Sequence, residues 1–131
     1  MPTSFTVANV AVIREDWGWV VVLGSVEEMD GQPYLILQRA DEFSADDVRL
    51  GQDQPYIEIC DQGRSWYGNI EQIELHPTKI EFQMSATATQ LMGNDGHFIF
   101  GFHLPSATFT ELESAIARIF DGFTCYARAG A

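Results

Sequence analysis

The segment Lys79-Ile80-Glu81-Phe82-Gln83-Met84 decides the fold class, because its polar and apolar residues alternate strictly. Successive side chains of a β-strand point to opposite faces, so Ile80, Phe82 and Met84 are predicted to face the interior while the other three face water. One buried and one wetted face are typical of antiparallel sheets. The segment therefore predicts an antiparallel sheet with one face in solvent.

The same period of two continues through most of the chain. Predicted strands cover residues 5–13, 17–23, 34–39, 56–61, 66–75 and 97–104. The alternation slips at Asn9-Val10, which predicts a β-bulge, and Asp30-Gly31 predicts a tight hairpin turn. Residues 40–55 are predicted to form a long acidic connection with one helical turn near residues 44–47. Residues 85–96 fit either a longer strand or a loop.

The period changes near the C-terminus. Apolar residues recur there at helical spacing and form one stripe, which consists of Leu112, Ile116, Ile119 and Phe120. Thr110 with Glu113 has the spacing of a capping box, and Thr108 with Glu111 offers a second register for the start of the helix. The residues around Cys125 are expected to form a frayed tail.

Taken together, these patterns predict one α+β domain over residues 1–131. We expect a mostly antiparallel, twisted sheet of about six to seven strands with one C-terminal helix packed on a face. One helix is too small to cover such a sheet. The second face is therefore expected to be in water, curled on itself, or covered by a partner.

The composition is that of a globular protein, with 46% hydrophobic residues among 131. The longest apolar run covers residues 19–23, far short of the ~20 residues that span a bilayer. Met1-Pro2-Thr3-Ser4 has neither the basic nor the apolar region of a secretory signal, so a cytoplasmic protein is expected. Cys60 and Cys125 are the two cysteines, and both are expected to be reduced there.

Acidic residues dominate the charge. Nineteen Asp and Glu oppose seven Lys and Arg, and the formal net charge is −12. The densest acidic stretch runs from Asp41 to Asp61, where Arg49 is the one opposing base. Nucleic acids and anionic membrane surfaces are bound by clustered Lys and Arg, so both are excluded as partners. The charge favours a basic protein partner.

No residue pattern indicates catalysis, a metal or a cofactor. His97 and His103 lie six residues apart in one predicted strand, so at ~3.3 Å per residue their Cα atoms are ~20 Å apart, too far to share a metal. Cys60 is flanked by Glu58 and Asp61, which disfavour a thiolate nucleophile. Ser/His/Asp arrangements and phosphate-binding glycine loops are absent from the sequence. We therefore predict a binding protein and not an enzyme.

A candidate partner surface combines acids with aromatic residues. We predict Asp41, Glu42, Asp46, Asp47 and Asp53 as steering charges, with Trp66 and Tyr67 as anchors. The alternatives are a solvated acidic loop for the charges and the edge of the core for the two aromatic residues. Trp17 and Trp19 share one predicted strand face, and either pack under the helix or join an interface. Gly68 would let the chain bend close to another backbone.

Several segments together resemble a known family. They are Tyr34-Leu-Ile-Leu-Gln-Arg39, Tyr56-Ile-Glu-Ile-Cys-Asp-Gln62 with Trp66-Tyr67-Gly68, Ile73-Glu-Leu75 with Lys79-Ile-Glu-Phe82, and the closing helix from Leu112 to Phe120. Over residues 30–122 the chain resembles the immunity protein 10 family, small bacterial antidote proteins of polymorphic toxin systems. The resemblance implies an α+β cytoplasmic protein that binds and neutralises a cognate toxin domain. It implies no catalytic residues.

The leading hypothesis is therefore an immunity protein that neutralises a cognate, basic toxin domain through an acidic surface. One alternative is a small-molecule-binding domain or enzyme that uses the second face of the sheet with His97 or His103. Another is an interaction module in which a homodimer covers that face.

Overall fold

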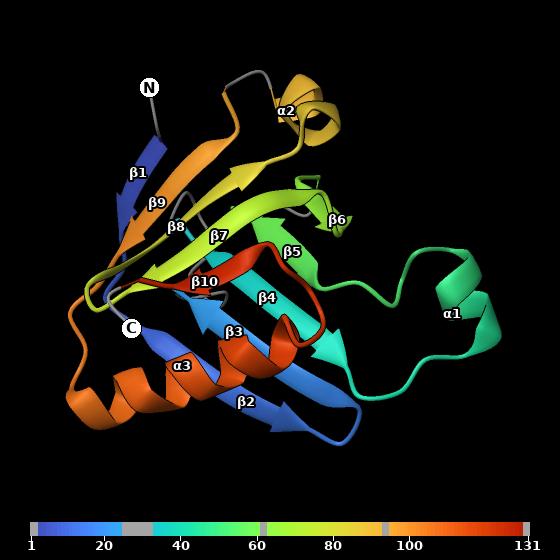
Figure 1. Ribbon diagram of the computed structural model, residues 1–131. Coiled ribbons are helices and arrows are strands. Elements are labelled where there is room, and N and C mark those ends of the chain that lie inside the picture. The colour runs from blue at the N-terminus through green and yellow to red at the C-terminus, as the bar shows by residue number, and fades with distance from the viewer. Residues whose placement is uncertain (1–2, 25–32, 61–62, 93–94, 130–131) are drawn as a thin grey trace.

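The computed structural model describes residues 3–24, 33–60, 63–92 and 95–129, which form ten strands and three helices (Figure 1). The strands are β1 (Thr3–Thr6), β2 (Val10–Glu15), β3 (Gly18–Leu23), β4 (Leu35–Ala40), β5 (Tyr56–Ile59), β6 (Ser65–Tyr67), β7 (Ile70–His76), β8 (Lys79–Met84), β9 (His97–Gly101) and β10 (Tyr126–Arg128). The helices are α1 (Ala45–Arg49), α2 (Ala86–Met92) and α3 (Ser106–Ile119). Within these described residues, no helix has the length and apolar character needed to cross a membrane.

The strands form two five-stranded sheets. In the meander sheet, β2, β3, β4, β5 and β6 lie in chain order, and every neighbouring pair is antiparallel. In the mixed sheet the order is β1-β9-β8-β7-β10, with parallel pairs β1–β9 and β7–β10 at the two edges. The α+β class and the mostly antiparallel pairing are confirmed. The expected single sheet is wrong, and so is its strand count.

The hydrophobic core lies between the two sheets. Ile80, Phe82 and Met84 of β8 are at most 1% exposed, as their alternation predicts. The rings of Phe82 and Phe98 stack with centroids 5.3 Å apart. The meander sheet contributes fully buried aliphatic residues to the same cluster: Val21, Leu23, Leu35, Leu37, Ile57 and Ile59. Each such side chain contributes about 1.5–3 kcal/mol by leaving water, so each sheet shields the inner face of the other.

Helix α3 continues the layer of the mixed sheet beyond its edge strand β10 (Figure 1). The buried stripe of α3 consists of Leu112, Ala115, Ile116 and Ile119, and the helix packs on β2, β3 and β4 of the meander sheet. Phe120 stacks on Tyr126 of β10 at 5.7 Å, and Arg128 of β10 pairs with Glu113 of α3. A helix on a sheet face is confirmed, whereas the tail expected to fray forms β10.

The start of α3 differs from both predicted capping boxes. The helix begins at Ser106, directly after Pro105, and no side chain caps its first turn. The Thr110 hydroxyl instead donates to the carbonyl oxygen of Ser106 at 2.9 Å. Pro105 is the N-cap residue, and the helix begins about one turn earlier than the predicted registers without a side-chain cap.

Residues 5–13, expected as one strand with a bulge, form β1 and β2 in different sheets. Between these strands, Val7 is buried in the core, and its N–H donates to the carbonyl oxygen of Gly101 at 2.9 Å. The slip in alternation at Asn9 therefore marks a crossing between sheets and not a bulge. The bulge prediction is wrong because the two halves of the segment pair with different neighbours.

Residues 66–75 also divide between the two sheets, as β6 and β7. The two residues that separate these strands have positive φ, 77° at Gly68 and 62° at Asn69. Two consecutive left-handed residues turn the chain sharply, which takes it from the edge of the meander sheet into the mixed sheet.

Three shorter predictions have different outcomes. The helical turn near residues 44–47 is confirmed as α1. Residues 85–96 are neither a longer strand nor a plain loop, because α2 lies there with Ala88 buried. The strand predicted over residues 56–61 ends at Ile59, where Cys60 adopts a φ of 62°. The Asp30-Gly31 turn lies outside the described residues.

Candidate functional site

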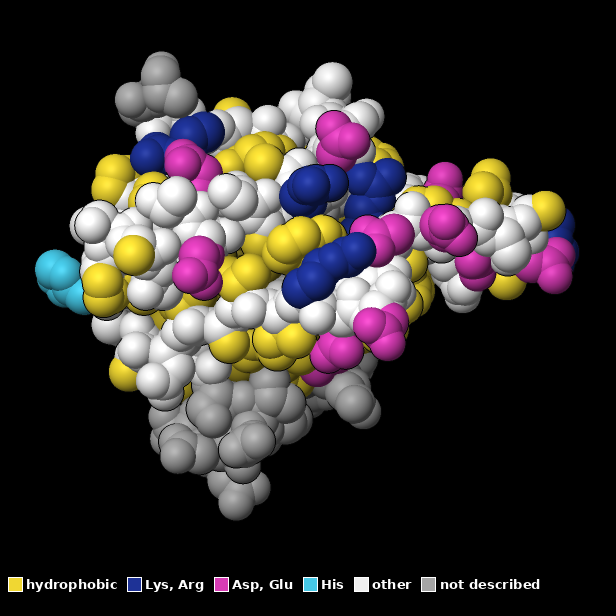
Figure 2. All heavy atoms as spheres, turned by 90° about the horizontal axis from the view of Figure 1, so that it is seen from below, with side chains coloured by type: hydrophobic (Ala, Val, Ile, Leu, Met, Phe, Trp, Pro, Cys, Tyr) yellow, Lys and Arg dark blue, Asp and Glu magenta, His cyan; other side chains and the backbone are white. Residues whose placement is uncertain are grey.

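The connection between β4 and β5, residues 41–55, forms an acidic arm that stands away from the two sheets and carries α1 (Figure 1). All five predicted steering charges lie on it: Asp41, Glu42, Asp46, Asp47 and Asp53. The first three are exposed, whereas Asp47 and Asp53 are half-buried. Figure 2 shows the arm at the right, where acidic and hydrophobic side chains lie side by side. The structure thus places the five acids on one projecting segment.

Hydrogen bonds between neighbouring residues of the arm stabilise its helical turn. The Ser44 side-chain oxygen accepts from the Asp47 N–H at 3.0 Å, and the Asp47 carboxylate accepts from the Ser44 N–H at 2.9 Å. This reciprocal capping box satisfies two backbone donors at the start of α1. Asp46 pairs with Arg49 at 3.3 Å on the exposed side of the turn. A helix of one turn is marginal alone, so these caps define the shape of the arm.

A second set of contacts fixes the arm to the turn between β2 and β3. Asp41 pairs with Arg14 at 2.5 Å, and its N–H donates to the carbonyl oxygen of Trp17 at 2.8 Å. The hydrogen bond to Asp41 raises the pKa of the Arg14 guanidinium. Arg14 also lies 5.0 Å from the centroid of the Trp19 ring. Asp41 therefore has a structural partner as well as a charge that faces solvent.

Arg39 holds the base of the arm against the end of α3. Its guanidinium lies between the rings of Phe43 and Phe123, 5.6 and 4.9 Å from their centroids. It also donates to the backbone carbonyl oxygens of Asp121 at 2.6 Å and Ile119 at 3.3 Å. A cation at this position is favourable because the carbonyls at a helix C-terminus carry partial negative charge.

A groove of about 300 Å³ lies where the arm joins the outer face of the meander sheet. We call it the arm groove, and its walls include Trp17, Asp47, Gln52, Gln54, Tyr56 and Tyr67. The rings of Tyr56 and Tyr67 contact each other with centroids 5.2 Å apart. Trp17 is 46% exposed and Tyr67 is 43% exposed. The groove therefore combines aromatic walls with one carboxylate, three amides and the guanidinium of Arg39.

The residue that follows β6 lies close to the end of the arm. The Gly68 N–H donates to the carbonyl oxygen of Pro55 at 2.8 Å, and a Cβ at Gly68 would lie 2.2 Å from Gln54 Oε1. The φ of 77° favours glycine at this position, whereas the nearby Gln54 atom is the end of a flexible side chain that can shift. The close backbone approach predicted for Gly68 is confirmed, and it positions the neighbouring Tyr67.

Buried hydrogen bonds hold Tyr56 in the groove wall. Its hydroxyl donates to one oxygen of Glu58 at 2.7 Å, and the hydroxyl of Tyr34 donates to the other oxygen at 2.6 Å. Burial raises the pKa of Tyr56, an effect that a hydrogen bond with Ser65 opposes and Glu58 reinforces. Because both carboxylate oxygens of Glu58 are bonded, this buried acid is a structural residue.

Trp66 and Tyr67 point to opposite faces of β6. Trp66 pairs in register with Ile57 and packs against the core, whereas Tyr67 pairs with Tyr56 and is exposed. Trp19 likewise packs on the core, but Trp17 lies in the turn before β3 and is exposed. The two predicted anchors are therefore not brought to one surface, and Tyr67 is the one that faces the arm groove.

Sequence reasoning missed two exposed apolar residues on the arm, Val48 and Leu50, and left the position of Trp17 open. Val48 and Leu50 on the arm are 56% and 60% exposed, and Trp17 lies at the arm groove. The available signal was the occurrence of Val48 and Leu50 inside an otherwise acidic, polar segment that has no strand alternation. Exposed apolar side chains rimmed by charges are typical of protein interfaces.

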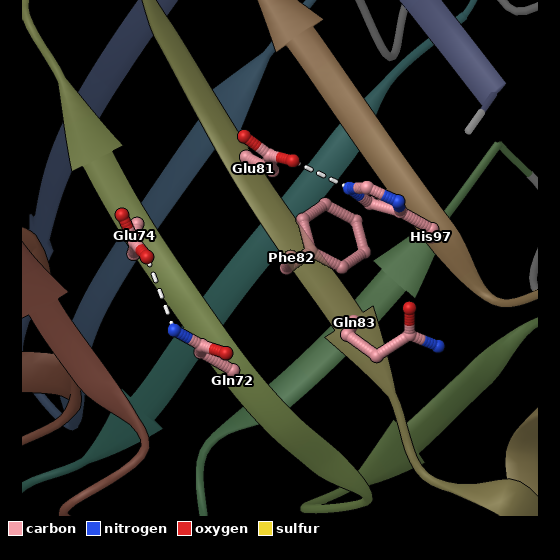
Figure 3. A pocket seen from close by; sticks show the side chains of 6 residues that line it. All are labelled: Gln72, Glu74, Glu81, Phe82, Gln83 and His97. Atoms are coloured by element: carbon pink, nitrogen blue, oxygen red, sulfur yellow. Dashed lines mark hydrogen bonds and ion pairs between the residues drawn. The ribbon is translucent and has the colours of Figure 1, made fainter. Parts of the chain in front are cut away.

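A second hollow, of about 270 Å³, lies on the outer face of the mixed sheet (Figure 3). Glu81 of β8 lies 2.5 Å from the ring Nε2 of His97 on β9, and Gln72 donates to Glu74 at 3.0 Å on β7. The hydrogen bond with His97 lowers the pKa of Glu81, against a smaller opposing effect of burial. Figure 3 shows two separate pairs, Glu81 with His97 between neighbouring strands and Gln72 with Glu74 along β7.

The two histidines expected in one strand lie apart in the fold. His97 is in β9, but that strand ends at Gly101, and His103 is exposed beyond it at a different hollow. Within the described part of the chain, no group of three or more His, Cys, Asp or Glu is arranged to hold a metal ion. The small-molecule alternative, with His97 or His103, stays a prediction.

The two cysteines are free thiols and both are half-buried. Burial raises the pKa of Cys60, partly offset by a backbone hydrogen bond from Tyr34 and by the charge of Arg64. Burial also raises the pKa of Cys125. A raised pKa disfavours the thiolate, so neither residue has the environment of a nucleophile.

Comparison with known proteins identifies the family. The model of the immunity protein 10 family matches residues 6–110, which include the acidic arm and the arm groove. The chain belongs to the immunity protein 10 family. The resemblance is confirmed, although the match begins and ends earlier than residues 30–122. No curated protein and no solved structure gives a significant match.

Proposed function

We propose that this protein neutralises a cognate bacterial toxin domain in the cytoplasm by binding it, without catalysing a reaction. Membership of a family of immunity proteins supports this function. We propose the acidic arm as the toxin-binding surface because it presents five carboxylates on a segment that projects from the body.

Electrostatics explains why such an arm suits an antidote. A negative surface attracts a basic partner, and steered association reaches ~10⁸–10⁹ M⁻¹s⁻¹ at low salt. Toxins that act on nucleic acids are basic where they contact phosphate. An acidic arm therefore covers such a site quickly, before the toxin damages the cell that makes it.

Charge gives speed, but a stable complex also needs apolar contact. Val48 and Leu50 at the arm and Trp17 and Tyr67 at the arm groove are exposed apolar side chains within the same acidic region. Aromatic residues surrounded by polar contacts are frequent hot spots of protein interfaces. We therefore propose that these four residues hold the toxin after the charges have guided it.

The structure removes the reason to expect a homodimer. A second copy was expected to cover an apolar sheet face, but the apolar faces of both sheets are buried against each other and α3. A net charge of −12 also makes two copies repel each other. The homodimer stays a prediction, which light scattering on the purified chain tests.

The function is tested by production with the toxin domain encoded beside its gene. Bacterial cells that make both proteins are expected to grow, and the purified chains are expected to form a complex that elutes together and lacks toxin activity. Growth arrest of cells that hold both folded proteins, with no complex on gel filtration, contradicts the proposed function.

A further inference from the structure

We propose that the arm groove receives a basic side chain of the toxin, an arginine or lysine, between Trp17 and Tyr67 with Asp47 as its counter-ion. This inference rests on the proposed function and specifies the chemistry of the partner at that surface. Nothing in the family match assigns such a pocket.

The composition of the groove favours a cation. Trp17, Tyr56 and Tyr67 present aromatic surface to a hollow of about 300 Å³, enough for one long side chain and not for a large ligand. Cations bind on the faces of aromatic rings, tryptophan best of all. The carbonyl oxygens of Gln52 and Gln54 can accept the hydrogen bonds that a guanidinium donates in its plane.

The charges around the groove select the same occupant. Asp47 bonds to Ser44 through Oδ2, so Oδ1 can accept from a ligand. An adjoining hollow at Trp17 is lined by Asp16, Asp41 and Glu42. Arg39 is the one cation among the groove-lining residues that the structure describes, and its guanidinium donates to the backbone carbonyl oxygens of Asp121 and Ile119 and lies over two rings. Asp41 is paired with Arg14, but Asp16, Glu42 and Asp47 outnumber Arg39 around the groove, and this excess of carboxylates favours a cation as the occupant.

Three of the groove-lining side chains have contacts that hold them in place without a partner. Asp47 is fixed by the cap of α1, Tyr56 by its bond to Glu58, and Tyr67 by the ring contact with Tyr56. A preformed pocket loses little side-chain entropy on binding, which strengthens the contribution of one inserted residue.

The test uses two capped tripeptides, acetyl-Gly-Arg-Gly-amide and the same peptide with citrulline in place of arginine. Citrulline has nearly the same shape but no charge. NMR is used to follow the Trp17 indole N–H and the ring signals of Tyr56 and Tyr67 during titration. We expect saturable shifts of these signals with the arginine peptide and at least tenfold weaker binding of the citrulline peptide, equivalent to about 1.4 kcal/mol.

Variants locate the binding to the groove. Trp17→Ala and Tyr67→Ala are each expected to weaken binding of the arginine peptide at least fivefold. Asp47→Asn removes the proposed counter-ion but keeps the aromatic rings, and is expected to weaken binding as well. Leu91→Ala, an exposed apolar residue on α2, is the matched control and is expected to bind as the wild type does. Unchanged amide signals of the core confirm that each variant is folded.

Equal shifts with both peptides, no saturable shift, or unchanged affinity of the folded groove variants overturns the inference. None of these outcomes affects toxin neutralisation, which is measured separately with the wild-type protein. If the wild-type protein inhibits the toxin but does not bind the arginine peptide, only the proposed pocket is refuted. If the wild-type protein does not bind the toxin, the proposed function is refuted.

Discussion

The guanidinium of Arg39 donates to the backbone carbonyl oxygen of Asp121 at 2.6 Å, which joins the base of the acidic arm to the end of α3. These residues are 82 positions apart in the sequence. Because Arg39 also stacks on Phe43 at the start of the arm, the body of the protein sets the direction in which the arm projects.

Replacement of Arg39 by methionine keeps much of the apolar stem but removes the donors to α3. We expect the free energy of unfolding to fall by about 1–3 kcal/mol, because two backbone carbonyls lose a charged partner. Chemical denaturation measures this change. Arg49→Met on the exposed side of α1 is the control and is expected to change stability by less than about 0.5 kcal/mol. Equal stability of the Arg39 and Arg49 variants contradicts the structural role.

Neutralisation of Asp46 and Asp47 by asparagine is expected to slow association with the toxin domain several-fold and to flatten its dependence on salt, because steering depends on net charge. Asparagine at position 47 retains an oxygen that can accept from Ser44, so the cap survives. Stopped-flow measurement over a range of salt concentrations gives both quantities. The control is Glu71→Gln with Glu111→Gln, which removes the same charge from other exposed positions. An association rate that falls equally in both double variants assigns the effect to net charge and not to the arm.

Trp66→Ala and Tyr67→Ala are expected to have opposite consequences, because the two side chains face opposite sides of β6. Loss of the core-packed Trp66 ring is expected to destabilise the fold by about 2 kcal/mol or more. Loss of the exposed Tyr67 ring is expected to change stability by less than about 1 kcal/mol and to raise the dissociation rate of the toxin complex. Thermal melts and dissociation kinetics separate the two effects. A stable Trp66 variant with a raised dissociation rate reverses this assignment.

The Glu81–His97 pair predicts a small acid sensitivity. The hydrogen bond from His97 lowers the pKa of Glu81 in the folded state below its ordinary value of 4.5. The pair therefore stabilises the fold above about pH 4.5, and the contribution is lost as the pH falls through the lowered pKa. Solvent screens the pair, since both side chains are about a third exposed. In His97→Gln, the Glu81 carboxyl signal is expected to titrate nearer its ordinary pKa by NMR. An unchanged titration curve excludes His97 as the cause.

Local patterns in the sequence were sufficient to predict several elements. The alternation in residues 79–84 predicts β8 and its buried face, and the apolar stripe of residues 112–119 predicts α3. Ser44 and Asp47 lie at capping-box spacing, which explains why a helical turn near them was predictable. In each case the determining contacts lie within a few residues of one another.

Long-range pairing was not predictable from the same patterns. A period of two indicates a strand but does not name its neighbour, so neither the parallel pairing of β1 with β9 nor that of β10 with β7 could be read from it. The division into two sheets depends on the crossings at Val7 and at Gly68-Asn69. The sequence signals at these points, a slipped alternation and one glycine, are equally consistent with bulges and bends.

The candidate site was predictable in its charges but not in its aromatic residues. Acidic residues in a polar segment predict an exposed connection, and the five acids do lie on the acidic arm. Whether an aromatic residue faces the core or the solvent depends on the register of its strand and on the position of the turn. Trp66 faces the core and Trp17 is exposed for these reasons. Local sequence patterns predict neither the register of a strand nor the exact position of a turn.

The most direct measurement of the central claim is the dissociation constant of the toxin domain for a variant in which the five acids of the arm are changed to amides. We expect the wild-type protein to inhibit the toxin at one equivalent and the folded variant to bind at least tenfold more weakly at low salt, with little further change as salt is added. Tight, strongly salt-dependent binding by that variant contradicts the claim that the acidic arm captures the toxin.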